Sequence, residues 1–188
     1  MPSHESHPLP PDQAGILLTL ARDSIRHGLD LGRPLAVDLE SLPRALRALR
    51  ATFVTLEKGG ELRGCMGRLE AARPLAEDVA SNAFAAAFQD FRFPPVTEGE
   101  LKALAIHLSL LTHPEPLPFA DEADLAGKLV PGRDGVILEA GGRRGTFLPS
   151  VWESLPDPGE FLVKLKAKAG IPRGTPFRAF RYGTEVLG

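Results

Sequence analysis

The chain has 188 residues, of which 43% are apolar and 24% charged. This length and composition are typical of one globular domain, or of two very small ones, and exclude a disordered or fibrous chain. Lysine and arginine number 22 against 24 aspartate and glutamate, so a formal charge of −2 gives no general attraction to nucleic acid. We therefore do not expect nucleic acid as a partner.

Cys65 is the only cysteine of the chain. An intramolecular disulfide is thereby excluded, and the chain cannot build an iron–sulfur cluster by itself. Residues 1–11 contain four prolines and no apolar run, which predicts a disordered tail and no secretory signal. The most apolar run elsewhere, residues 83–88, is far shorter than the roughly 20 residues that span a bilayer. We therefore expect a cytoplasmic protein without a membrane partner, with one domain over residues 12–188.

Glycine, proline and capping residues divide the chain into short helices and strands, which favours an α+β fold. Two glycine pairs, at 59–60 and 141–142, mark hairpin turns. Thr97 and Glu100 form a capping box, the signature of a helix start. The predicted elements are a helix over 12–28, a hairpin over 51–69, a helix over 74–88, a short helix from 97, a strand over 106–110, a hairpin over 135–148 and a helix over 157–170.

The two hairpins are similar in sequence. Residues 55–65 align with 137–146 through a shared glycine pair followed by Arg-Gly, with a one-residue gap. One interpretation is an internal duplication, with halves around 51–90 and 135–170 that share one core and place both hairpins in one continuous sheet. The alternative is chance similarity between glycine turns, which are common.

Five motifs, in this order, resemble the AMMECR domain family. They are Leu-Arg-Gly-Cys-Met-Gly at 62–67, Asp-Phe-Arg-Phe-Pro-Pro at 90–95, Leu-Ser-Leu-Leu at 108–111, Gly-Arg-Arg-Gly-Thr-Phe-Leu-Pro at 142–149 and Leu-Lys-Ala-Lys-Ala-Gly at 165–170. Residues 148–162 look like the bacterial branch, AmmeMemoRadiSam system protein A. The resemblance implies an antiparallel, barrel-like sheet with flanking helices, built from two related hairpin-plus-helix halves. It also implies association with a Memo-like protein and a radical S-adenosylmethionine enzyme, and it assigns no reaction.

Cys65 is the first candidate for chemistry. Arg63 stands two residues before it on a predicted strand, so both side chains should share one face. Gly64 between them would leave the backbone open to a ligand, and a nearby guanidinium favours the nucleophilic thiolate. His107, on a separate strand, is a weaker candidate for a base. The alternative is that Cys65 is a small buried apolar residue, as free cysteines often are.

Asp90 and Arg92 lie in a loop directly after a predicted helix, where residues often serve binding. They could hold a carboxylate or an amide of a ligand. They could equally form an ion pair within the loop that turns Phe91 and Phe93 into the core.

Two functions follow from these residues. The first is a component of a modification system that binds a protein or small molecule in a cleft around Arg63, Gly64, Cys65, Asp90 and Arg92, with any catalysis depending on Cys65. The second is a non-catalytic recognition domain in which Cys65 is structural. The sequence has no Walker A loop, no nucleophile elbow and no His-Glu-x-x-His motif, and we expect neither a cofactor nor a metal ion on this chain.

Overall fold

The computed structural model describes residues 8–188, which form two compact units. The N-terminal unit comprises the described residues up to 111 together with residues 185–188, and the C-terminal unit comprises residues 112–184. Each unit has its own four-stranded sheet and its own hydrophobic core.

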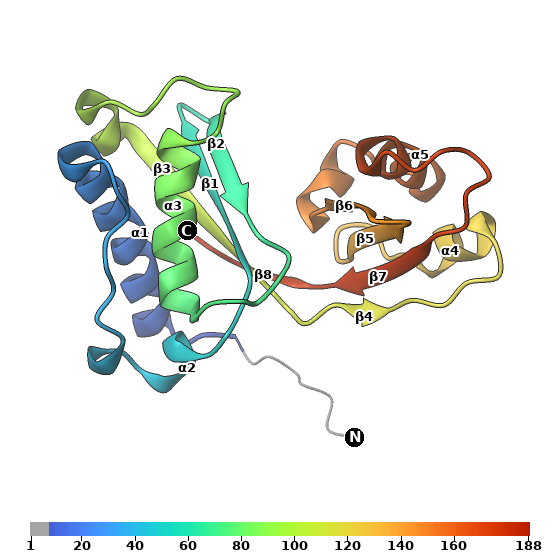
Figure 1. The fold of residues 1–188 in the computed structure, drawn as a ribbon, viewed down its shortest axis with the longest axis horizontal. Helices are drawn as coiled ribbons and strands as arrows, with labels where there is room; N and C mark the ends of the chain where they lie inside the picture. The colour runs from blue at the N-terminus through green and yellow to red at the C-terminus, as the bar shows by residue number, and fades with distance from the viewer. Residues whose placement is uncertain (1–7) are drawn as a thin grey trace. The chain divides into compact units, whose positions relative to one another are not determined.

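Helices cover one face of the sheet in the N-terminal unit (Figure 1). Its strand order is β2-β1-β3-β8, and β1 pairs antiparallel with both β2 and β3. Alternate residues of β1 and β3, such as Val54 and Leu108, are fully buried in one core with residues of α1 and α3. The elements of this unit are α1 (Pro11–Leu31), η1 (Leu39–Ser41), α2 (Arg44–Arg47), β1 (Thr52–Lys58), β2 (Glu61–Gly67), α3 (Leu75–Phe88), η2 (Glu98–Ala103), β3 (Leu104–Leu111) and β8 (Thr184–Leu187).

The C-terminal unit has the strand order β4-β7-β5-β6, with antiparallel pairing throughout. Its core includes Val136 and Leu138 of β5 together with Trp152 and Phe161, whose rings stack at 3.7 Å between centroids. Trp152 Nε1 donates a hydrogen bond to the Asp134 carbonyl at 2.7 Å, so its buried polar atom is satisfied. The elements are β4 (Glu115–Pro116), α4 (Glu122–Lys128), β5 (Gly135–Ala140), β6 (Arg143–Phe147), η3 (Pro149–Glu153), α5 (Pro158–Ala169) and β7 (Arg178–Tyr182).

The structure confirms the predicted hairpins and main helices. All four glycines of the two turns have positive φ, as two-residue hairpin turns require. The Thr97–Glu100 capping box is formed and begins η2, which is a 3-10 helix. The first helix ends later than predicted, because Gly28 lies inside α1 against Phe84 and Phe88, and the left-handed residue that ends the helix is Gly32.

The prediction of one continuous sheet is wrong. The hairpin β1–β2 and the hairpin β5–β6 lie in two separate sheets, so the duplication in its predicted form, with one shared sheet and core, is overturned. Each sheet has two edge strands, and the described residues form no closed barrel. The fold is a mixed α/β arrangement of two antiparallel sheets with flanking helices.

Part of the segment predicted as a tail, residues 1–11, is folded. Residues 1–7 lie outside the described residues, and Pro11 already belongs to α1. Leu9 packs against the N-terminal core, and its backbone N–H donates to Glu185 Oε1 at 2.6 Å. Residues 8–10 are therefore part of the folded unit.

Candidate functional site

Cys65 lies in a row of three side chains across the N-terminal sheet. Thr55 on β1 is paired with Cys65 on β2 and with His107 on β3. Residues that oppose one another directly project from the same face of a sheet. This face is turned away from α1 and α3, because the alternate residues, such as Val54 and Leu108, are packed in the core. All three members of the row are half-buried, so the Cys65 thiol belongs to a partly accessible polar surface.

Polar groups surround the thiol. Thr55 Oγ1 lies 3.3 Å from Cys65 Sγ, a distance at which either group could donate a hydrogen bond. The pKa of Arg92 is raised, first by its hydrogen bonds to Asp90. Asp90 links Arg92 to the strand at Cys65, because its Oδ2 accepts from both the Cys65 N–H and Arg92 Nη2.

Asp90 fastens the loop after α3 to the edge of the sheet. Its Oδ2 accepts a hydrogen bond from the backbone N–H of Cys65 at 2.9 Å, so the carboxylate caps β2, an edge strand. Arg92 donates to both oxygens, from Nε at 2.9 Å and from Nη2 at 2.7 Å. These Arg92 bonds, followed by the Cys65 N–H bond, hold the pKa of the Asp90 carboxyl well below its usual range. The structure thus brings Cys65, Asp90 and Arg92 together.

The same loop exposes an aromatic ring. The Asp90–Arg92 ion pair does not turn Phe91 inward, because Phe91 is 97% exposed. The loop around Phe91 is held in place, since Phe93 N–H donates to the Asp90 carbonyl at 3.1 Å and Val96 N–H donates to the Ala87 carbonyl at 2.9 Å. A phenylalanine exposed on a fixed loop is available for contact with a partner.

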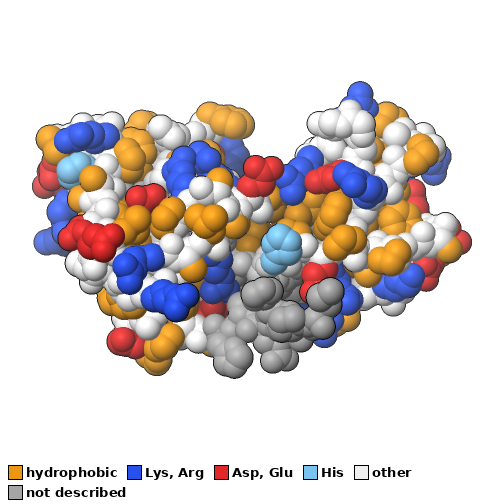
Figure 2. All heavy atoms as spheres, turned by 60° about the horizontal axis from the view of Figure 1, so that its bottom comes forward, with side chains coloured by type: hydrophobic (Ala, Val, Ile, Leu, Met, Phe, Trp, Pro, Cys, Tyr) orange, Lys and Arg blue, Asp and Glu red, His pale blue; other side chains and the backbone are white. Residues whose placement is uncertain are grey.

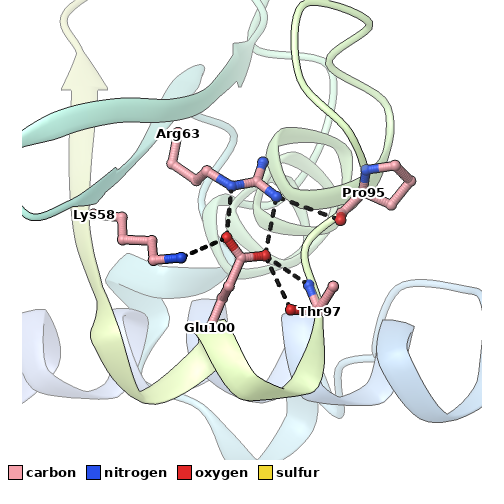
Figure 3. A network of polar contacts seen from close by, with 5 residues as sticks. All are labelled: Lys58, Arg63, Pro95, Thr97 and Glu100. Atoms are coloured by element: carbon pink, nitrogen blue, oxygen red, sulfur yellow. Dashed lines mark hydrogen bonds and ion pairs between the residues drawn. The ribbon is translucent and has the colours of Figure 1, made fainter.

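Arg63 is bound to Glu100 and to the Pro95 carbonyl (Figure 3). The register of β2 shifts between its pairings with Leu56 and Glu57, and this bulge leaves Arg63 without an opposing residue on β1. Its guanidinium forms two hydrogen bonds to Glu100, at 3.0 and 3.1 Å, and one to the Pro95 carbonyl. The prediction that Arg63 shares a concavity with Cys65 assumed a regular strand. The bulge makes β2 irregular at Arg63, so that assumption does not hold there.

Glu100 is the centre of this second cluster. It accepts from Arg63, from Lys58 Nζ at 3.0 Å and from both the N–H and the hydroxyl of Thr97. These bonds, those from Arg63 first, hold the pKa of Glu100 well below its usual range. The sequence indicated Glu100 only as half of a capping box, whereas it also ties β2 and β1 to η2.

Gly64 is closed to ligands. A Cβ at this position would overlap the Ala86 carbonyl oxygen of α3, so the close approach that this glycine permits is that of the helix. The expectation of an open backbone at Gly64 is therefore corrected. This contact holds α3 against β2 and so positions the loop that carries Asp90.

His107 shares the sheet face with Cys65 but points to another partner. Its Nε2 is 3.5 Å from Glu57 Oε2, while Thr55 stands between His107 and Cys65 in the row. Because neighbouring strands are about 4.8 Å apart, the backbones at Cys65 and His107 are separated by about 10 Å. The described contacts of the thiol and of the imidazole thus do not form a Cys–His dyad.

A buried polar group that the sequence did not single out lies at the start of β1. Asp78 of α3 accepts from both the N–H and the hydroxyl of Thr52, at 3.0 and 2.7 Å, and from Asn82 Nδ2 at 2.9 Å. Burial raises the pKa of Asp78. The signal available in the sequence was a pair of polar residues at i and i+4 in an alanine-rich helix. Their role is to lock α3 to the sheet.

The described residues contain no group of three or more histidine, cysteine, aspartate or glutamate side chains that could hold a metal ion. Within the same residues, no helix has the length and apolar character required to cross a membrane. On the face seen in Figure 2, basic and acidic side chains are interspersed with hydrophobic ones.

The fold and the site define an α+β protein with a polar-lined thiol on the edge strand of one sheet. The AMMECR1 family model matches residues 18–187, and the chain belongs to this family. A protein of Methanothermobacter thermautotrophicus is 40% identical over 96% of both chains. A protein of Thermotoga maritima is 44% identical and covers 71% of this chain and 74% of its own.

The fold is also similar to a solved structure. The crystal structure of a protein from Pyrococcus horikoshii, described as uncharacterized, is 30% identical with a TM-score of 0.84 and covers 93% of this chain and 90% of its own. This similarity supports the fold with two four-stranded sheets as one that family members share.

Proposed function

We propose that the surface around Cys65 is the binding site through which this chain acts as a component of a modification system. The observation that carries the proposal is a partly accessible thiol with Thr55 Oγ1 at 3.3 Å from Sγ, next to the Asp90–Arg92 ion pair that binds the Cys65 N–H. A cysteine that served only as a small apolar core residue would be enclosed by apolar side chains.

The partners in this proposal come from the family resemblance. They are a Memo-like protein and a radical S-adenosylmethionine enzyme of the AmmeMemoRadiSam system, acting in the cytoplasm, with this chain as the bacterial-type protein A of that system. Two features of the site suit a protein partner: the exposed Phe91 and the half-exposed Arg92 project from one fixed loop.

The second candidate is a recognition domain without catalysis. It is favoured by the absence of a described base in contact with Sγ, since His107 is directed to Glu57. A Cys65-dependent step would need a base to be supplied by the partner or by the substrate.

The test measures binding and thiol reactivity on the full chain. We expect the purified Memo-like or radical S-adenosylmethionine protein of the same organism to bind the wild type in isothermal titration calorimetry. Cys65→Ser and Arg92→Ala should fold normally and bind at least fivefold more weakly. Arg133→Ala, which removes an arginine that is also ion-paired to an aspartate, is the matched control and should bind like the wild type.

Alkylation by iodoacetamide separates the two candidates. We expect the folded protein to react at Cys65, and Arg92→Ala to react more slowly because it lacks the neighbouring positive charge. A thiol that does not react in the folded state, together with unchanged partner binding by Cys65→Ala, would contradict the proposal and leave Cys65 as a structural residue.

A further inference from the structure

The C-terminal unit contains an apolar groove unrelated to Cys65. Two chain segments line it, residues 116–122 and 174–180, and its volume is about 660 Å³. This volume is in the range of ligand sites. Six of its thirteen lining residues are phenylalanine or proline, namely Pro116, Pro118, Phe119, Pro176, Phe177 and Phe180. We call this feature the aromatic groove.

The charged residues of the aromatic groove are already neutralised at one end. Glu122 lines it and is ion-paired with Lys166, whose side chain is almost fully buried. The Lys166 ammonium also lies 5.2 Å from the centroid of the Phe177 ring. The centroids of the Phe177 and Phe119 rings are 5.1 Å apart, so the two packed rings form a fixed apolar surface of the groove.

The aromatic groove adjoins a pocket with an excess of positive charge. Arg178 lines both the aromatic groove and a second pocket of about 290 Å³, whose wall includes Arg143 and Arg144. Arg178 and Arg144 share one carboxylate, that of Glu139, at 2.9 and 3.0 Å. Arg143 lines the same pocket and donates a hydrogen bond to the Gly170 carbonyl at 2.7 Å, so three arginines, Arg143, Arg144 and Arg178, lie around this pocket with one glutamate. We call them the arginine cluster.

The arginine cluster can bind the anionic group of a ligand. Arg178 is 77% exposed, so it can donate to a ligand anion while Arg144 keeps its ion pair with Glu139. Arginine binds carboxylates with forked hydrogen bonds. An anionic group next to an apolar body would therefore complement the groove and the cluster together.

We propose that the aromatic groove and the arginine cluster together bind an extended acidic peptide, with proline or aliphatic side chains on the phenylalanines and carboxylates on the arginines. Beside the groove, β4 has two residues and pairs with Phe180 and Arg181 of the five-residue β7, and Leu117 N–H donates to the Ala179 carbonyl at 2.9 Å. An open, proline- and aromatic-lined trough suits an extended chain. This site goes beyond the function proposed for Cys65 and does not depend on it.

The experiment is fluorescence anisotropy on the full chain with labelled synthetic peptides. The probes join Pro-Leu-Pro-Leu to Glu-Glu-Glu in both orders, with matched peptides that carry Gln for Glu or Ser for Leu. We expect at least one acidic probe to bind, and both matched peptides to bind at least fivefold more weakly. Arg178→Gln and Phe180→Ala should each weaken binding about fivefold or more, whereas Arg133→Gln, another exposed and ion-paired arginine, should not.

Several results would overturn the proposal. They are no binding of either acidic probe, equal binding of the Gln peptides, or unchanged binding by both Arg178→Gln and Phe180→Ala. Decanoate and inorganic phosphate are titrated in parallel. If decanoate binds with the same dependence on Arg178 while the peptides do not, the site takes a small amphipathic acid and not a peptide. If phosphate alone binds, the cluster is a simple anion site and the groove has no part in it.

Discussion

The two units use the same order of elements but carry different side chains at corresponding places. In the N-terminal unit the hairpin β1–β2 is followed by α3 and then by β3, which pairs with β1. In the C-terminal unit the hairpin β5–β6 is followed by α5 and then by β7, which pairs with β5. The order hairpin, helix, strand is therefore common to both sheets, although the sheets are separate.

The side chains differ in one row of three paired residues across each sheet. Cys65, Thr55 and His107 form it in the N-terminal unit. In the C-terminal unit the corresponding row is Thr146, Ile137 and Phe180. A polar row with a thiol thus stands where the other unit has a largely apolar row, so the shared scaffold does not determine the chemistry of its face.

The prediction with the largest expected effect on stability concerns the contact between a hairpin glycine and the following helix, which both units have. Gly64 lies against the Ala86 carbonyl of α3, and Gly145 lies against Ala169 of α5, where a Cβ would come within 2.7 Å of the Ala169 Cβ. We expect Gly64→Ala and Gly145→Ala each to lower the free energy of unfolding by about 3 kcal/mol, because backbone must move to admit the methyl group. Urea denaturation measures this loss.

The control for both glycines is Gly15→Ala. Nothing lies within 4 Å of a Cβ at Gly15 in α1, so this change should stabilise the protein by about 0.5–1 kcal/mol. A Gly64→Ala variant as stable as the wild type would show that helix and hairpin are not in close contact in the N-terminal unit, and the equivalence of the units would fail.

The second prediction concerns the hairpin edges, which the units cover differently. Buried Asp90 accepts from the Cys65 N–H on β2, whereas in the C-terminal unit exposed Lys168 donates to the Thr146 carbonyl on β6. Asp90→Ala should cost about 2–3 kcal/mol, because it leaves a backbone N–H and Arg92 without their carboxylate. Lys168→Ala should cost less than about 1 kcal/mol. Equal losses in urea denaturation would mean that the Asp90 anchor contributes no more than a surface contact.

Local signals in the sequence were sufficient for most elements. Glycine pairs, a proline before α3 and the capping box fix backbone conformation within a few residues, so the hairpins and helices could be predicted from their own residues. Strand β7 was missed because Arg178-Ala-Phe-Arg-Tyr182 shows little alternation of polar and apolar residues. The assignment of the hairpins to separate sheets depends on pairing between distant segments, which no local pattern carries.

The candidate site could be predicted only in part, because some of its contacts are local and others join distant segments. Asp90 and Arg92 are two residues apart, so their ion pair follows from the sequence, and the family resemblance brought them to Cys65. The direction of Arg63 depends on a bulge and on Glu100, 37 residues further along the chain. A one-residue irregularity in a strand changes the face that a side chain occupies. No pattern within residues 62–67 indicates this bulge.

The third prediction is the dependence of stability on acid. The pKa values of Asp90 and Glu100 are lowered on folding, chiefly by hydrogen bonds from Arg92 and Arg63. A lowered folded pKa adds stability above the unfolded value of about 4, and this stability is lost as the pH falls toward the folded value. We therefore expect the free energy of unfolding to decrease below about pH 4. In the C-terminal unit the described carboxyl with a lowered pKa is that of exposed Asp124.

The double variant Asp90→Asn, Glu100→Gln tests this assignment. Its stability should be lower than that of the wild type at pH 7 and should fall less between pH 4 and pH 2. Asp124→Asn serves as the comparison from the C-terminal unit and should keep the acid sensitivity of the wild type. If the double variant and the wild type lose stability in parallel, the acid response does not arise at these two carboxyls.

The smallest expected effect on stability is at the centre of the polar row. Thr55→Val preserves the branched shape and makes the N-terminal row resemble the apolar C-terminal one, so stability should change by less than about 1 kcal/mol. Its hydroxyl lies 3.3 Å from Sγ, and in the thiolate state it can only donate to the sulfur. Because that bond favours the thiolate, the rate of Cys65 alkylation at pH 7 should fall by about two- to tenfold in Thr55→Val. Ser109→Ala, which removes a hydroxyl from the same face of β3, should leave the rate unchanged. An equal rate in all three proteins would mean that Thr55 positions nothing at the thiol, and the two rows would then differ in composition without differing in chemistry.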